Sequence, residues 1–233
     1  MRVMTYTVLI VLQGYREWTE SLGSDREWLI QLVQSRLYEV LQSLCKDFDG
    51  IAIPLRYDIL LSLLPPDVDI EEFSDIVRKS LSKYSPTPIT IKACCGGLPE
   101  VINVCSKDLD IDTIARCEEY EALVVAHADL NYFTETTIKD GVLNAYMGVL
   151  RYVSRILDLI GNKALIQYLG GDNVVALTSL KYLDEVIKAM TSFKNVKVGV
   201  GISLKPREAF MKATQALSVL RREGRVRSFY IVK

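Results

Sequence analysis

Two aspartates have surroundings that suit chemistry. Asp172 lies in a Gly-Gly-Asp-Asn stretch at residues 170–173, between short apolar runs at 164–168 and 174–177. This pattern is typical of a β-hairpin, because glycine accepts the positive φ angles of a tight turn. Asp129 follows another apolar run, at residues 123–126. If that strand pairs beside the hairpin in an antiparallel sheet, the two carboxylates meet at one end of the sheet.

Paired carboxylates with no obvious basic partner suit a hard divalent cation, and such a cation commonly binds a triphosphate. The simpler interpretation is that Asp129 and Asp172 are turn residues with solvated side chains. His127, the one histidine of the chain, lies two residues before Asp129 and therefore on the same strand face. It is either a general acid or base or a structural hydrogen-bonding residue.

Composition limits the class of protein. The chain has 233 residues, 49% hydrophobic and 24% charged, which suffices for one large domain or two small ones. Lys and Arg number 28 against 29 Asp and Glu, and this balance argues against holding long nucleic acid by bulk electrostatics. No apolar run reaches the roughly 18 residues needed to cross a bilayer. With no evident signal peptide, we expect a soluble, cytoplasmic protein that does not bind membranes.

The cysteines indicate the same compartment. The five are odd in number, lack any Cys-x-x-Cys spacing and accompany a single histidine. Such a set supports neither a zinc site nor a disulfide framework. We therefore expect no disulfides and a reducing cytoplasm.

Hydrophobic periodicity predicts the elements that position the two aspartates. Strands are predicted at 5–12, 51–55, 59–64 and 89–94, and in the second half at 122–128, 164–168, 174–177, 196–202 and 229–232. Helices are predicted from a capping box at Ser24 and Glu27 to Leu44, and at 69–83, 138–159, 182–192 and 206–222. The connection at 99–120 is predicted to be mostly helical.

The two halves repeat one order of elements. Gln13 and Asp129 are 116 positions apart, and Asp58 and Asp172 are 114 apart. A β-α-β-β-α-β order that occurs twice predicts an α+β fold of two tandem ferredoxin-like, palm-type domains, with antiparallel sheets covered by helices. We place the domains at residues 1–119 and 120–233. The alternative is two unrelated α+β halves.

The predicted halves differ in chemistry. Gln13 stands where the second half has Asp129, and a neutral amide is a weaker ligand for a hard cation. Arg56, two residues before Asp58, partly neutralises that carboxylate. We therefore expect a degenerate metal site in the first half, whose roles are packing, assembly, or holding a substrate through Arg56 and Asp58.

The Gly-Gly-Asp-Asn hairpin, with Asp129 on the preceding strand, resembles the palm domains of nucleotidyl cyclases and GGDEF diguanylate cyclases. More closely, nearly the whole chain resembles the archaeal GTP cyclohydrolase III family, built from two such palms. Further matching segments are Tyr15, Trp18-Thr19, Gln34-Ser35-Arg36-Leu37-Tyr38, Arg56-Tyr57-Asp58, residues 127–131 and residues 199–202. The chain departs from the family at Gln13-Gly14 and Asp58-Ile59, where an Asp-Asn pair can occur.

The resemblance implies a Mg²⁺-dependent GTP hydrolase that opens the imidazole ring of guanine and releases two phosphates. The product would be 2-amino-5-formylamino-6-ribosylaminopyrimidinone 5'-phosphate, a precursor of riboflavin and of the deazaflavin F420. Two Mg²⁺ ions, activation by K⁺, and a homo-oligomer are also implied. The alternatives are a nucleotidyl or dinucleotide cyclase and a non-catalytic GTP-binding regulatory module.

The resemblance also implies residue roles. The metal ligands would be Asp129, Asp172 and the backbone carbonyl of Leu130, and the catalytic residues would be Asp129, Asp172 and His127. The nucleotide would contact Asn131, Tyr132, Phe133, Gly170, Gly171, Asn173, Arg221, Arg56 and Asp58. Among these, residues 131–133 would cradle phosphate through backbone N–H groups. Arg221 would meet phosphate like the basic residue of the GGDEF tail; alternatively, it only complements the helix dipole.

Overall fold

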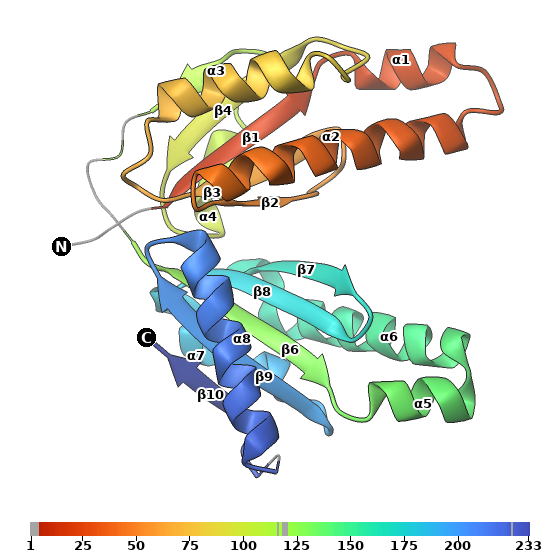
Figure 1. Cartoon of the computed structure of the whole chain (residues 1–233), viewed down its shortest axis with the longest axis vertical. Coiled ribbons are helices and arrows are strands. Elements are labelled where there is room, and N and C mark those ends of the chain that lie inside the picture. Colours follow the sequence, from red (N-terminus) through yellow and green to blue (C-terminus); the bar gives the residue numbers. More distant parts are fainter. Residues whose placement is uncertain (1–4, 116, 118–120, 225) are drawn as a thin grey trace. The chain divides into compact units, whose positions relative to one another are not determined.

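The computed structural model describes residues 5–115, 117, 121–224 and 226–233 (Figure 1). The chain divides into two compact units, Met1–Gly96 with Glu100–Tyr120, and Gly97–Pro99 with Glu121–Lys233. Each unit is an α+β structure with one five-stranded sheet and packed helices.

The first unit is built around strand β1, whose seven residues are all buried. Its sheet has the order β2-β3-β1-β4-β5, in which the first four strands have the ferredoxin-like arrangement. Only β5 pairs parallel to its neighbour, β4. The elements are β1 (Tyr6–Leu12), α1 (Tyr15–Ser21), α2 (Glu27–Asp47), β2 (Ile51–Ile53), β3 (Ile59–Leu64), α3 (Ile70–Leu81), β4 (Ile89–Cys95), α4 (Glu100–Cys105) and β5 (Thr113–Ile114).

Helices α2 and α3 cover one face of this sheet. Leu37 and Leu41, four residues apart, share one face of α2 and are fully buried, as are Phe73 and Val77 on α3. Burying a large apolar side chain contributes about 1.5–3 kcal/mol. The apolar stripes of both helices thus fix their position on the sheet.

The second unit repeats the arrangement, with sheet order β10-β9-β6-β8-β7. Strand β10 pairs parallel to β9, and the other pairs are antiparallel. Helices α6 and α7 bury residues such as Tyr152 and Val186 against one face. The elements are β6 (Leu123–Leu130), α5 (Phe133–Asp140), α6 (Val142–Ile160), β7 (Leu165–Gly170), β8 (Asn173–Ser179), α7 (Leu183–Met190), β9 (Val196–Ser203), α8 (Pro206–Arg222) and β10 (Phe229–Val232).

Helix α8 lies directly against β9. A Cβ atom added at Gly199 would come within 2.8 Å of the Leu217 backbone nitrogen, and one at Gly201 within 2.5 Å of the Ala213 nitrogen. Real Cβ atoms essentially never approach other atoms this closely. The two glycines therefore permit the close approach of helix and strand that carries the end of α8 to the end of β6.

The structure confirms the predicted α+β class and corrects four details. The sheets are mixed rather than purely antiparallel, because a short parallel strand joins one edge of each. The segment at 99–120 contains only the six-residue helix α4 and then β5 in its described part. The long helix predicted from 138 is two helices, interrupted at Gly141 with φ 89°. Helix α2 follows Arg26 without a side-chain cap, so the Ser24 capping box is wrong.

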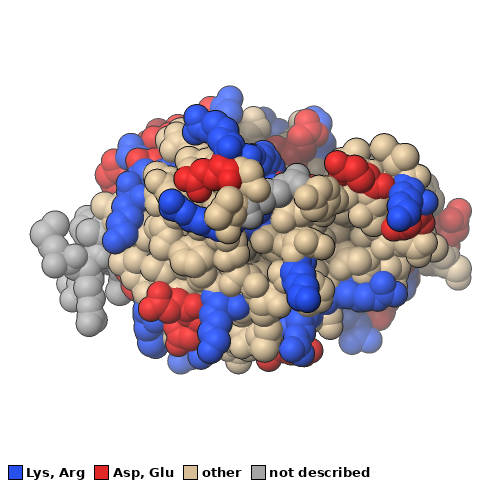
Figure 2. Space-filling model, turned by 90° about the horizontal axis from the view of Figure 1, so that it is seen from below, with Lys and Arg blue, Asp and Glu red and all other residues tan. Residues whose placement is uncertain are grey.

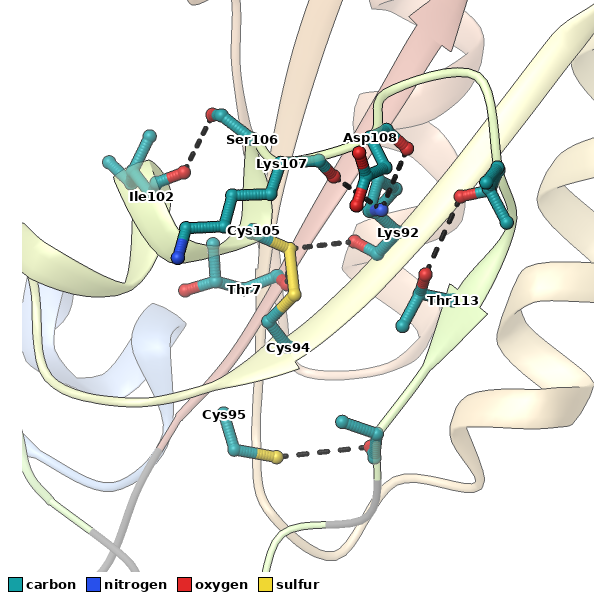
Figure 3. The surroundings of a disulfide bond; sticks show 12 residues. Thr7, Lys92, Cys94, Cys95, Ile102, Cys105, Ser106, Lys107, Asp108 and Thr113 are labelled. Carbon is teal, nitrogen blue, oxygen red and sulfur yellow. Dashed lines mark hydrogen bonds between the residues drawn. A yellow bond between two sulfur atoms is a disulfide. The ribbon is translucent and has the colours of Figure 1, made fainter.

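The expectation that the cysteines form no disulfides is also wrong. Cys94 is bonded to Cys105, with a Cα–Cα distance of 5.7 Å (Figure 3). Cys95 is bonded to Cys117, with a Cα–Cα distance of 5.4 Å. Adjacent residues of β4 thus hold both α4 and the chain beyond β5. The sequence could not show this, because the pairing depends on the fold of the connection. Cysteine content no longer indicates a reducing compartment, since disulfides are typical of oxidising ones and of intracellular hyperthermophile proteins.

None of the helices in the described ranges is long and apolar enough to span a lipid bilayer. On the face drawn in Figure 2, basic and acidic side chains are interspersed, in keeping with the net charge of −1.

Candidate active site

The structure brings Asp129 and Asp172 together. Strand pairing sets Asp129 opposite Asn173, the residue after Asp172, and the turn before it uses positive φ at Gly170 (101°) and Gly171 (59°). Asp129 is 4% exposed. Burial raises the pKa of Asp172 above its ordinary value, and the neighbouring Asp129 carboxylate raises it further by repulsion and a shared hydrogen bond. The two carboxyl groups therefore form one acidic pair.

Among the residues that the structure describes, Asp129 has two basic partners, contrary to the sequence-based expectation of none. Arg221 Nε donates to Asp129 Oδ2 at 3.0 Å, and Arg221 Nη2 contacts the same oxygen. Lys197 Nζ lies 3.5 Å from that oxygen. Lys197 faces Asp129 directly across the β6–β9 pair, and Arg221 is 92 positions away in the sequence. Local sequence therefore could not reveal either contact.

Lys197 was missed by the sequence reasoning, although a signal was present. It is the first of three non-apolar positions, Lys197, Gly199 and Gly201, that alternate along an otherwise apolar strand. Alternate strand positions share one face of a sheet. A lysine in line with two glycines therefore marks the face that a helix approaches closely, and this lysine is 2% exposed.

His127 is connected to Asp172 through Asn173. His127 Nε2 lies 3.0 Å from Asn173 Oδ1, and Asn173 Nδ2 donates to Asp172 Oδ1 at 3.1 Å. Because an amide oxygen only accepts, Nε2 carries the proton. Burial lowers the pKa of His127 below its ordinary value, although Asn173 and Asp129 oppose this. Its Nδ1 atom is buried without a hydrogen-bond partner among the described residues.

Residues 131–133 form the turn from β6 into α5. Asn131 N–H donates to Asn195 O at 2.7 Å, so it is not free to hold phosphate as predicted. Tyr132 has a left-handed backbone (φ 63°) and precedes the helix, whose first residue is Phe133. The side-chain oxygen of Asn131 is buried and has no hydrogen-bond partner in the described part of the chain.

A polar pocket opens beside this turn. Its volume is about 430 Å³, and its lining includes Asn131, Lys194, Lys197 and Arg227. Three of these four side chains are cationic, which suits an anionic group. The pocket and Asp129 share Lys197, so an anion in the pocket would lie near the acidic pair.

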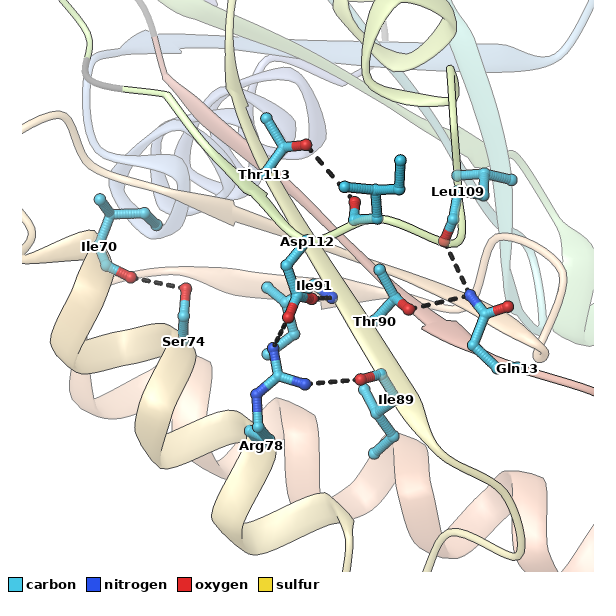
Figure 4. Close-up of polar contacts among 11 residues, drawn as sticks. Gln13, Ile70, Ser74, Arg78, Ile89, Thr90, Ile91, Leu109, Asp112 and Thr113 are labelled. Atoms are coloured by element: carbon cyan, nitrogen blue, oxygen red, sulfur yellow. Dashed lines mark hydrogen bonds and ion pairs between the residues drawn. The ribbon is translucent and has the colours of Figure 1, made fainter.

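The first unit uses the corresponding positions differently. Gln13 donates to Thr90 Oγ1 (3.0 Å) and to the Leu109 carbonyl (2.8 Å), so its amide anchors the segment after α4 (Figure 4). Arg56 pairs with Asp58 at 2.9 Å, as their spacing predicts. A neutral, hydrogen-bonded amide and an arginine-paired carboxylate are poor ligands for a divalent cation. Arg56 and Asp58 lie in the first unit, whereas Asp129 and Asp172 lie in the second.

The donor set in the second unit fits Mg²⁺ that arrives with a nucleotide. Proteins bind Mg²⁺ through one or two carboxylates plus substrate phosphates, rather than through an all-protein cage. The described residues contain no cluster of three or more His, Cys, Asp or Glu side chains that could form such a cage. Asp129 and Asp172 are two adjacent carboxylates, which is enough for Mg²⁺ that is also bound by substrate phosphates.

The ferredoxin-like order of both sheets, together with the acidic pair at the hairpin of the second, defines a tandem palm-type protein. Residues 4–233 match the family model described as GTP cyclohydrolase III. The chain therefore belongs to the GTP cyclohydrolase III family and is an enzyme of that type.

Individual relatives agree over most of their length. The GTP cyclohydrolase III of Aeropyrum pernix is 33% identical over 217 residues, covering 89% of this chain and 88% of that one. The GTP cyclohydrolase III of Pyrobaculum calidifontis is 35% identical over 229 residues, covering 95% and 96%.

Solved structures similar to this chain include bacterial GGDEF-type domains. The active GGEEF domain of a diguanylate cyclase from Vibrio cholerae has a TM-score of 0.43 at 14% identity, covering 48% of this chain and 84% of that one. A GGDEF domain from Pseudomonas aeruginosa has a TM-score of 0.40 at 20% identity, covering 48% and 83%.

Proposed function

We propose that this enzyme hydrolyses GTP, opening the imidazole ring of guanine and releasing two phosphates. In ring opening, one water adds at C8 while the C8–N9 bond breaks, which leaves the formyl group on N7. One further water cleaves each of the two phosphoanhydride bonds. The product is 2-amino-5-formylamino-6-ribosylaminopyrimidinone 5'-phosphate. Family membership supports this reaction.

The observation that carries the proposal is the acidic pair of Asp129 and Asp172. Strand pairing supports this, because Asp129 lies opposite Asn173, the residue after Asp172. We propose that Asp129, Asp172 and the backbone carbonyl of Leu130 are the Mg²⁺ ligands. We also propose that two Mg²⁺ ions bind and that K⁺ is an activator. When bound, Mg²⁺ would polarise phosphoryl oxygens and lower the pKa of a bound water.

Residues around the pair would hold the nucleotide. Arg221 and Lys197 supply positive charge for a triphosphate, and the pocket beside Asn131 adds Lys194 and Arg227. Gly170 and Gly171 leave the hairpin backbone open to a phosphate or base. His127 holds Asn173, and Asn173 holds the Asp172 carboxylate. We propose a positioning role for His127 through this chain of hydrogen bonds.

The test is to incubate the pure protein with GTP, Mg²⁺ and K⁺ while following the ultraviolet spectrum and free phosphate. We expect two phosphates per GTP and loss of the purine absorbance. Release of pyrophosphate with an intact purine would indicate cyclisation, and GTP binding without turnover would indicate a regulatory module. Either result would refute the proposal.

Substitution of the acidic pair tests the site separately. Asp129→Asn and Asp172→Asn should each reduce turnover by about a hundredfold or more. Loss of a residue that binds the metal directly should cost at least as much as loss of a residue that only orients a metal ligand. Asp58→Asn, in the first unit, should reduce it less. Circular dichroism must show that each variant is folded. Equal losses in all three variants would argue against a site confined to the second unit.

A further inference from the structure

The ion pair between Asp129 and Arg221 joins two side chains in unlike surroundings. The Asp129 side chain is 6% exposed, whereas that of Arg221 is 53% exposed. Both Nε and Nη2 of Arg221 donate to the same oxygen, Asp129 Oδ2. A charged carboxylate this deeply buried requires a cationic partner, because an unpaired buried charge is strongly destabilising.

Among the described residues, the cations that pair with Asp129 equal in number the two carboxylates of the acidic pair. Asp129 and Asp172 carry two negative charges when ionised, and Arg221 and Lys197 carry two positive charges. A divalent cation that entered this cluster would add two uncompensated positive charges next to two resident cations. It can bind tightly only if a resident cation leaves or if an anionic ligand arrives with it.

Arg221 is the cation that is free to leave. Lys197 lies on β9, inside the sheet of the second unit, and its side chain is 3% exposed. Arg221 lies in the last turn of α8, which ends at Arg222. Its long side chain already reaches solvent, and it can turn away from Asp129 without moving the helix. Guanidinium binds phosphate oxygens as readily as carboxylate oxygens.

We infer that Arg221 is the counter-ion of Asp129 in the free enzyme and competes with a divalent cation for that carboxylate. When the metal–nucleotide complex binds, Arg221 leaves Asp129 and binds the triphosphate instead. This inference rests on the function proposed above. In the free enzyme the arginine pairs with the buried carboxylate. It also makes binding of the bare cation weak and couples cation binding to nucleotide binding.

The test measures Mn²⁺, a spectroscopically visible substitute for Mg²⁺, by titration followed by electron paramagnetic resonance in the absence of nucleotide. Arg221→Gln should bind Mn²⁺ roughly threefold to tenfold more tightly than the unchanged protein. Arg222→Gln is the matched control, since it removes the same charge from the next residue. Within the described residues, Arg222 Nε donates to the Ser218 carbonyl at 3.4 Å, in the turn of α8 before it. Its Mn²⁺ affinity should stay within about twofold of the unchanged protein. Arg221→Lys, which keeps the charge, should lie between the other two.

A second measurement adds a non-hydrolysable GTP analogue. In the unchanged protein the analogue should raise Mn²⁺ affinity strongly, and in Arg221→Gln it should raise it less, because the variant has already lost the competing cation and a phosphate contact. Unchanged or weaker Mn²⁺ binding by folded Arg221→Gln would overturn the inference, even if GTP turnover is normal. An equal gain in Arg222→Gln would overturn it too, by assigning the effect to net charge. Absence of Mn²⁺ binding in all proteins, with and without the analogue, would overturn both the inference and the proposed metal site.

Discussion

At the scale of single residues, His127 distinguishes positioning from proton transfer. Its Nε2–H donates to Asn173, which in turn orients Asp172. We expect His127→Leu to lower kcat by about 10- to 100-fold, since it leaves Asn173 Oδ1 unpaired and Asp172 less well oriented. His127→Gln can supply an amide donor in nearly the same place, and it should recover most of the lost activity.

The comparison is made by steady-state kinetics at saturating Mg²⁺, with Mn²⁺ affinity as the second measurement. If His127 acts as general acid or base, the glutamine variant will be as slow as the leucine variant while binding Mn²⁺ normally. That outcome would favour the acid–base role that the lone histidine also suggested from sequence.

Sequence alone predicted the acidic pair but not its cationic partners. Asp129 and Asp172 each stand in a local pattern, a strand end and a Gly-Gly turn, that can be recognised within a few residues. Arg221 and Lys197 reach Asp129 only because β9 pairs with β6 and α8 packs across both. Such long-range contacts follow from tertiary packing, and no local pattern contains them.

At the scale of elements, the position of α8 depends on two missing side chains. Gly201→Ala would force the new Cβ against the α8 backbone, with Ala213 N at 2.5 Å. We expect the free energy of unfolding to fall by about 1–3 kcal/mol, as for other overpacked interfaces. Activity should fall too, because a displaced α8 carries Arg221 away from the place where it would bind the triphosphate.

Gly148→Ala is the control for that substitution. Gly148 lies inside α6, and a Cβ there would meet nothing within 4 Å. Alanine is the better helix former by about 1 kcal/mol, so this variant should be slightly stabilised and fully active. Denaturant unfolding of both variants provides the measurement. Equal stability of the two would contradict the close helix–strand contact.

Elements with strong periodicity were predicted well, and connections were not. The apolar runs of β1, β6 and β9 and the proline-initiated α8 lie close to their predicted bounds. Helix α1 was missed, and it buries no residue, so it lacks the apolar stripe on which prediction depends. The segment 99–120 was mistaken for helix because its described part is held by disulfides, Lys92 and Gln13 rather than by its own pattern (Figure 3 and Figure 4).

At the scale of the whole molecule, covalent reinforcement is confined to one unit. All five cysteines precede residue 118, and both disulfides lie in the first unit. They join residues 11 and 22 positions apart. A disulfide that closes a loop of this size stabilises the folded protein by about 2–4 kcal/mol. The second unit, which carries the candidate site, depends on non-covalent contacts among its described residues.

A thiol titration checks this assignment. Cys45 is the one free cysteine, and burial raises its pKa to about 12. A thiol reagent at neutral pH should therefore detect almost no thiol in the native protein, one in denaturant, and five after reduction. Cys45→Ser should remove the single thiol seen in denaturant. Five thiols in denaturant without reductant would contradict both disulfides.

The assembly state belongs to this scale too. The homo-oligomer implied by family resemblance stays a prediction, which light scattering can test.

The two disulfides also change what a break in the backbone would mean. A protease that cut between Cys95 and Cys105 would leave two fragments joined by both bridges, and a cut between Cys105 and Cys117 would leave them joined by one. In either case the nicked enzyme would migrate as a single species until it was reduced. The connection that carries α4 can thus be cleaved without the two fragments separating, as long as the disulfides remain oxidised.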